Sequence, residues 1–166
     1  MSPFDIDERL EADGVRPPRQ ERSRATFERL LDAAQELLER GGTDGTSMAD
    51  VAQRAGSSIG ALYTRVPDKA TLVRAVQLRL VERQLSGAEE LARADPRGNA
   101  PLGEIIGRLL VTVTTSIRAD AGLLRAIIVQ GMRDAVMRER VSLGLESLTR
   151  LLADILRPPF RRAYVP

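Results

Sequence analysis

The chain has 166 residues, of which 43% are hydrophobic and 29% charged, and its net charge is +2 at pH 7. This balance is typical of a soluble globular protein and excludes a disordered chain. Because the sequence contains no Cys, His or Trp, we exclude disulfides, thiolate or imidazole metal sites, and enzymes that need a Cys or His nucleophile or base. No signal-peptide pattern and no apolar run of roughly 20 residues is present, so we expect a cytoplasmic protein without a cofactor.

The N-terminal part of the chain changes the sign of its charge. Residues 1–14 hold five acidic residues and one Arg, whereas residues 15–24 hold four Arg and one Glu. Pro17 and Pro18 favour an extended backbone. We interpret the acidic part as a mobile lead-in. The basic part either reaches along a DNA backbone or into a minor groove, or it is a solvated tail.

The clearest periodicity follows and predicts a helix that ends at Gly41 and Gly42. Its apolar face consists of Phe27, Leu30, Leu31, Ala34, Leu37 and Leu38. A second, short helix should begin with Thr46 or Ser47 as its N-cap, and Asp50 resembles the acidic residue of a capping box.

Residues 46–69 have the pattern of a helix-turn-helix, a motif that lays its second helix in a DNA major groove. Ala52 and Ala55 are small enough for close helix packing, and Gly56 supplies the turn. Ser57 or Ser58 then caps a third helix that extends to about residue 64.

Asp68 is expected to cap a fourth helix, which runs from Lys69 towards Leu91. Residues 93–101 are rich in turn formers, and three more helical patterns cover residues 101–117, 121–131 and 134–156. Without strand-like alternation, the chain is predicted to be all-α. We expect a disordered arm at 1–21, a helix-turn-helix DNA-binding domain at 22–67, a helical regulatory domain at 68–157 and a tail at 158–166.

Four segments resemble, in order and spacing, the tetracycline-repressor (TetR) family of transcriptional regulators. They read L-L-D-A-A-Q-E-L-L-E-R-G-G, T-S-M-A-D-V-A-Q-R-A-G, S-x-G-A-L-Y and D-K-A-T-L, and the match covers residues 22–80. The resemblance implies a three-helix DNA-binding head joined to a helical ligand-binding domain. It further implies a repressor that binds an operator as a homodimer and is released by a small apolar molecule.

The resemblance also implies which residues contact DNA. Ser47 and Lys69 would hold phosphates at helix N-termini, and Tyr63 would touch the backbone or a thymine methyl. The side that faces the groove would carry Ser58, Ile59, Gly60, Ala61 and Thr64.

Three residues at two places depart from the family pattern. Ser57 follows Ala55-Gly56 where the family usually has an apolar residue. Arg65-Val66 replaces an aromatic residue or His followed by Phe. Arg65 adds a charge that can bind phosphate or guanine, so the family's base preference does not transfer to this chain.

Lys69 is the only lysine beside 24 arginines. A lysine at a helix N-terminus opposes the helix dipole, so helix stability does not explain its presence. This favours a phosphate contact over an ordinary exposed side chain.

The later helices carry apolar rows that either pack as core or line a ligand pocket. Because residues 74–159 contain no Phe or Tyr, such a pocket would be aliphatic and could not stack a planar cation. The expected lining is Leu109, Val113, Ile117, Ile127, Met132 and Met137.

Two alternatives remain beside a ligand-regulated repressor. An enzyme is disfavoured because the acidic residues are scattered and no phosphate loop is present. A degenerate or truncated relative would associate with a partner without regulated DNA binding. Family members usually carry two further helices that build the dimer, whereas this chain stops in a proline-broken tail that is not expected to be helical. We therefore expect exposed apolar faces and a weak dimer or a monomer.

Overall fold

The computed structural model describes residues 6–18, 20–94 and 100–164, and within these ranges it contains eight helices and no strand. The all-α prediction is confirmed. The helices are α1 (Ile6–Ala12), α2 (Glu21–Gly41), α3 (Met48–Arg54), α4 (Ile59–Arg65), α5 (Lys69–Ala94), α6 (Leu102–Ala119), α7 (Ala121–Gly131) and α8 (Ala135–Tyr164).

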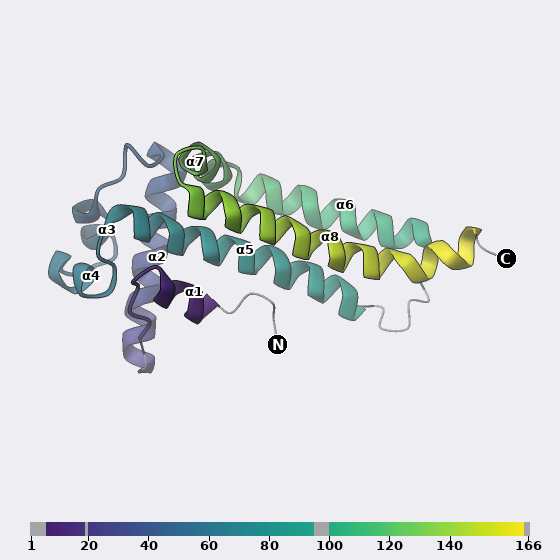
Figure 1. The fold of residues 1–166 in the computed structure, drawn as a ribbon, viewed down its shortest axis with the longest axis horizontal. Coiled ribbons are helices and arrows are strands. Elements are labelled where there is room, and N and C mark those ends of the chain that lie inside the picture. The colour runs from purple at the N-terminus through teal and green to yellow at the C-terminus, as the bar shows by residue number, and fades with distance from the viewer. Residues whose placement is uncertain (1–5, 19, 95–99, 165–166) are drawn as a thin grey trace.

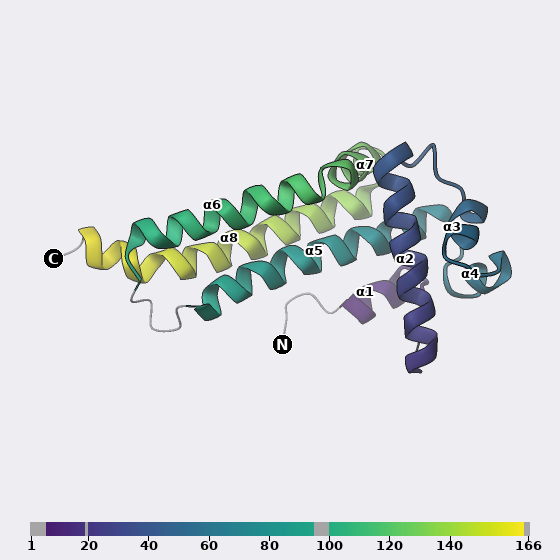
Figure 2. The same ribbon diagram turned by 180° about the vertical axis from the view of Figure 1, so that it is seen from behind.

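The helices form a head and a long bundle (Figure 1). Helices α2, α3 and α4 make the head at one end of the molecule. Helices α5, α6 and α8 run side by side away from it, and α7 lies against α2 (Figures 1 and 2). Helix α5 begins beside the head and continues into the bundle, so one uninterrupted helix connects the two parts.

The head is organised around the predicted apolar face of α2. Phe27, Leu30, Leu31, Ala34 and Leu38 are buried, and Leu37 packs against them at the edge of the core. Short helices are unstable in isolation, so the burial of this apolar face is the main contribution to the stability of the head.

The turn between α3 and α4 depends on Gly56, whose φ of +63° suits a residue without a side chain. The Gly56 N–H donates to the Gln53 carbonyl at 3.1 Å, and the Ser57 N–H donates to the Ala52 carbonyl at 2.9 Å. This pair of hydrogen bonds is a Schellman motif. It ends α3 and redirects the chain into α4, as the sequence predicts.

The prediction of a mobile acidic lead-in is wrong for the described residues from Ile6 onward. Residues 6–12 form α1, and Leu10 and Val15 are buried in the same core as the head. Two apolar side chains on so short a segment give little periodicity. They are nevertheless enough to anchor it against α5, and residues 1–5 lie outside the described residues.

The prediction of a non-helical C-terminal tail is also wrong, because α8 continues to Tyr164. A proline removes one backbone hydrogen bond and bends a helix, but flanking turns can carry the helix past it. Residues 165–166 lie outside the described residues. Among the described helices none is long and apolar enough to cross a membrane.

Candidate nucleic-acid interface

Ser47, one of the two residues predicted to cap α3, is its N-cap. Its Oγ accepts the Asp50 N–H at 3.1 Å, and its hydroxyl donates to Asp50 Oδ2 at 2.6 Å. The side chain of Ser47 is exposed, so it is accessible to a phosphate. In this geometry the hydroxyl proton points to the Asp50 carboxylate, and Ser47 would have to turn its hydroxyl to donate to an anion.

Ser58 caps α4 through a hydrogen bond from the Ala61 N–H to its Oγ at 3.1 Å. One side of α4 is fixed in the core by Leu62 and Val66, which are fully buried. Val66 therefore fills the core position where the family usually has Phe.

The opposite side of α4 faces solvent and carries the residues predicted to read DNA. Ile59 and Tyr63 are 46% and 49% exposed; Ser58, Gly60 and Thr64 are also exposed, while Ala61 and Arg65 are half-buried. Large apolar and aromatic side chains left exposed at i and i+4 on a short helix indicate a binding surface.

Gly60 lies in the middle of this surface. A Cβ built at Gly60 would meet no atom of the described residues within 4 Å, so none of these residues requires a glycine there. Its absence of a side chain is useful only to a partner that approaches the helix backbone. The neighbouring Thr64 donates its hydroxyl to the Gly60 carbonyl at 2.8 Å and keeps its oxygen free to accept.

Lys69 begins α5, as predicted, and its ammonium group has partners that the sequence does not reveal. Nζ donates to the carbonyl oxygens of Thr43 at 2.9 Å and Thr46 at 3.2 Å. Both carbonyls belong to the loop that leads into Ser47. An ammonium group has three N–H bonds, so one donor remains for a phosphate.

The basic arm is not a free tail in the described residues, because Val15 and Pro18 are buried. Arg22 and Arg24 are exposed on the first turn of α2, which begins at Glu21. Upstream, the Arg16 N–H donates to the Arg65 carbonyl at 2.9 Å, so this stretch runs along the end of α4. Arg19 lies outside the described residues.

The six residues predicted to line an aliphatic pocket differ in their burial, and the pocket itself stays a prediction. Ile127 and Met137 are core residues, Leu109 is half-buried, and Val113, Ile117 and Met132 are exposed, Met132 to 76%. Helical periodicity identifies an apolar row but does not tell whether a neighbouring helix covers it. Core packing is the correct interpretation for Ile127 and Met137.

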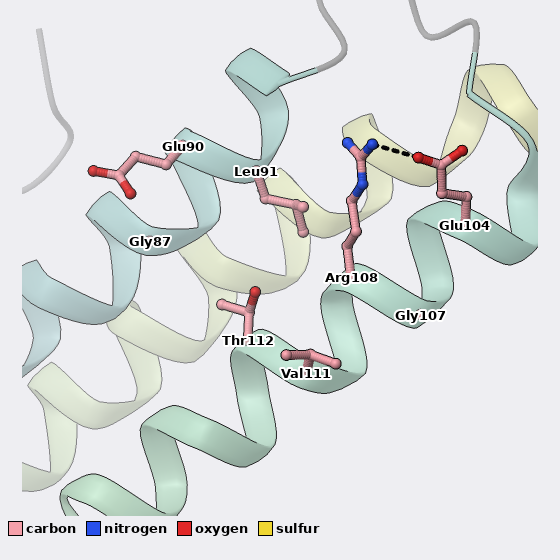
Figure 3. A pocket seen from close by; sticks show the side chains of 8 residues that line it. All are labelled: Gly87, Glu90, Leu91, Glu104, Gly107, Arg108, Val111 and Thr112. Carbon is pink, nitrogen blue, oxygen red and sulfur yellow. Dashed lines mark hydrogen bonds and ion pairs between the residues drawn. The ribbon is translucent and has the colours of Figure 1, made fainter.

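A groove of about 690 Å³ instead lies between α5 and α6 (Figure 3). Its lining residues belong to the ends of these two helices that lie away from the head (Figure 1). Its lining combines apolar and polar side chains. Leu91, Val111 and Thr112 lie beside the ion pair that Arg108 forms with Glu104. The complete lining is Gly87, Glu90, Leu91, Glu104, Gly107, Arg108, Val111 and Thr112. None of the six predicted pocket residues belongs to it.

Comparisons with known proteins point to one family. Residues 30–76 match the model of the bacterial regulatory proteins of the tetR family. Over 103 residues, 60% of this chain, the sequence is 31% identical to the HTH-type transcriptional repressor KstR of Rhodococcus jostii (strain RHA1). The aligned part makes up 44% of KstR, so the chain spans less than half the length of this curated relative.

Solved structures share the fold. A tetR-family transcriptional regulator from Mesorhizobium loti superposes with a TM-score of 0.73 at 22% identity, over 87% of this chain and 72% of that one. The fatty acid degradation regulator FadR from Bacillus halodurans gives a TM-score of 0.64 at 16% identity, over 89% and 72%. At these identities the likeness concerns the fold alone.

Proposed function

The chain belongs to the TetR family of bacterial regulatory proteins, and we propose that it is a sequence-specific repressor of transcription that a small molecule releases from its operator. The observation that supports DNA binding most directly is the outer side of α4. There Ile59, Gly60 and Tyr63 are exposed, while Leu62 and Val66 hold the helix rigidly against the core.

Phosphate contacts would position the head on the duplex. Lys69 keeps one ammonium donor beyond its two bonds to the loop carbonyls, and Ser47 is exposed at the N-terminus of α3. Backbone N–H groups at a helix N-terminus favour anions. Such contacts give register and affinity but no sequence preference.

Base recognition would come from the groove-facing side chains of α4. Ile59 and Ala61 offer apolar contact to thymine methyls, and Thr64 offers a hydroxyl oxygen. Arg65 would reach a phosphate or the two acceptors of guanine. Tyr63 would touch the backbone or a thymine methyl from the same face.

The releasing ligand would act through the groove between α5 and α6. Leu91 and Val111 supply apolar contact there, and the ion pair of Arg108 with Glu104 supplies polar groups. Because α5 continues from this groove to Lys69 in the head, a displacement of α5 at one end would move the other. Two heads would be needed to read a two-fold operator, so we propose a homodimer as the repressing species.

Selection of duplexes from a randomised library with the wild-type chain tests this function. A repressor enriches one sequence and binds it more tightly than random duplex, with an affinity that falls as salt rises. A relative that associates only with a protein partner would enrich no sequence and show no salt-dependent binding to any duplex.

A further inference from the structure

We propose that residues 13–18 position helix α4 by connecting its C-terminal end to helix α8. This inference rests on the proposed function, because α4 is the helix that would read DNA. It assigns to the N-terminal segment a role other than contacting DNA.

One end of the segment supports the last turn of α4. The last carbonyl groups of a helix lack partners within the helix, and the Arg16 N–H supplies one for Arg65 at 2.9 Å. Nearby, a Cβ built on Gly14 would lie 3.8 Å from Cγ of Pro67, so the turn after α1 runs against the residues that follow α4.

The other end is fixed to α8 by a buried ion pair. Both carboxylate oxygens of Asp13 accept from Arg140, at 2.5 and 2.7 Å. The two side chains are only 6% and 7% exposed. A bidentate ion pair of this kind fixes both the distance and the orientation of the two side chains. Removal of one partner would leave the charge of the other buried without compensation.

The turn between these ends is itself rigid. The Gly14 N–H donates to the Glu11 carbonyl and the Val15 N–H to the Leu10 carbonyl, each at 2.9 Å. Leu10 and Val15 are buried in the core. Asp13 and Arg16 therefore cannot move independently, and a displacement of Arg140 is passed on to the end of α4.

Helix α4 needs such support because it has only seven residues, and isolated helices of this length are unstable. Arg140 lies one turn after Met137, whose carbonyl accepts from the buried Gln77 of α5 at 3.0 Å. The segment thus links α4 to the place where α8 and α5 are joined. Figures 1 and 2 show α1 beside α5, between the head and the bundle.

The test uses the variant Asp13→Asn with Asp120→Asn as its control. Asp120 is also buried and accepts from Arg83 at 2.9 Å, but it lies at the junction of α6 and α7, far along the chain from α4. Hydrogen exchange of the backbone amides of α4, measured on the free protein, reports the support of that helix without DNA.

We expect Asp13→Asn to raise the exchange rates of the α4 amides by about tenfold, as for coupled neighbouring groups. Asp120→Asn should leave them at the wild-type value, and Asp13→Glu, which keeps the charge, should restore part of the protection. Arg16→Pro removes the N–H itself while the ion pair stays intact, and it should raise exchange in the last turn of α4. This variant decides the question if Asp13→Asn does not fold.

On a duplex selected by the wild-type chain, Asp13→Asn should weaken binding by about tenfold, with a smaller loss on random duplex. Unchanged exchange in α4 for Asp13→Asn and Arg16→Pro would overturn the proposal. Equal increases for Asp13→Asn and Asp120→Asn would overturn it as well, because they would indicate a general loss of stability. If the wild-type chain binds no duplex, the proposed function fails while the exchange measurement still decides the role of residues 13–18.

Discussion

The ammonium group of Lys69 donates to the Thr43 carbonyl at 2.9 Å and so ties the first turn of α5 to the loop that leads into α3. The single lysine of the chain therefore has a structural role in addition to the phosphate contact proposed for it. The two roles are compatible, since the loop carbonyls offset the charge of a cation placed at a helix N-terminus.

Lys69→Ala should remove both roles. We expect a loss of about 1–3 kcal/mol in the free energy of unfolding, since two carbonyl oxygens lose a charged donor. Binding to selected and random duplex should weaken by similar factors, and the slope of log K against log salt should fall by about one unit. Titrations at several salt concentrations measure this. A change of sequence preference with an unchanged salt slope would show that Lys69 does not bind phosphate.

Gly122 lies where α7 packs closely against α2. A Cβ at Gly122 would stand 2.9 Å from the Glu39 carbonyl oxygen and 3.2 Å from the Glu39 Cα, and backbone atoms cannot yield cheaply. Gly122→Ala should therefore lower the free energy of unfolding by about 1–3 kcal/mol. Gly131→Ala is the control and should not destabilise, because it lies on the same helix and its Cβ would meet no atom of the part of the chain that the structure describes within 4 Å. Denaturant unfolding that gives equal stability for both variants would contradict this close packing.

Asp134 predicts a loss of stability in acid. Burial raises its pKa, but hydrogen bonds from Arg74 and from the Met137 and Val136 N–H groups outweigh burial, so the pKa is lowered overall. A carboxyl group with a lowered folded-state pKa contributes stability above its unfolded pKa of about 3.9. This contribution disappears as the pH falls through the folded-state value. The free energy of unfolding should consequently decline less in acid for Asp134→Asn than for wild type, and parallel curves would refute the assignment.

The exposed apolar side of α6 leads us to expect that copies of this chain associate with one another. Ile106, Leu110, Val113 and Ile117 recur at helical spacing, and each is at least 39% exposed, which is unusual for a monomer. Light scattering at micromolar concentration should detect a weak dimer or larger species. Leu110→Glu should reduce its mass, whereas Ile59→Glu, at an exposed position in the head, should not. A wild-type chain that stays monomeric would show that this stripe does not mediate association.

The head was predictable because its signals are local. The apolar period of α2, the caps at Ser47 and Ser58 and the glycine turn at Gly56 each depend on residues a few positions apart. The exposure of Ile59 and Tyr63 follows from the same helical geometry. The DNA-contact roles of these residues stay predictions.

Other features depend on partners far away in the sequence. The sequence around Asp13 does not indicate that its ion-pair partner is Arg140, 127 positions later. The residue types in the loop before α3 do not indicate that their carbonyl groups accept hydrogen bonds from Lys69. Met132 and Met137 differ in burial although both continue apolar rows. Met137 is covered by neighbouring residues, whereas Met132 is exposed. The helix at the N-terminus likewise depends on the residues that pack beside it. The continuation of α8 past its prolines depends on the helical turns that flank them.

The proposed DNA-binding role of α4 is tested most directly by Gly60→Glu. The side chain would project from an exposed helix position where no described residue lies within 4 Å of the Cβ, so the fold and the helical content should be unchanged. A carboxylate at the groove-facing surface would repel phosphate and block the approach of the backbone to the bases. Gly103→Glu, an exposed and equally open position on α6, is the control. In a titration of a duplex selected by the wild-type chain, Gly60→Glu should show no specific binding while Gly103→Glu binds as wild type; wild-type affinity in Gly60→Glu would contradict the docking of α4 in the groove.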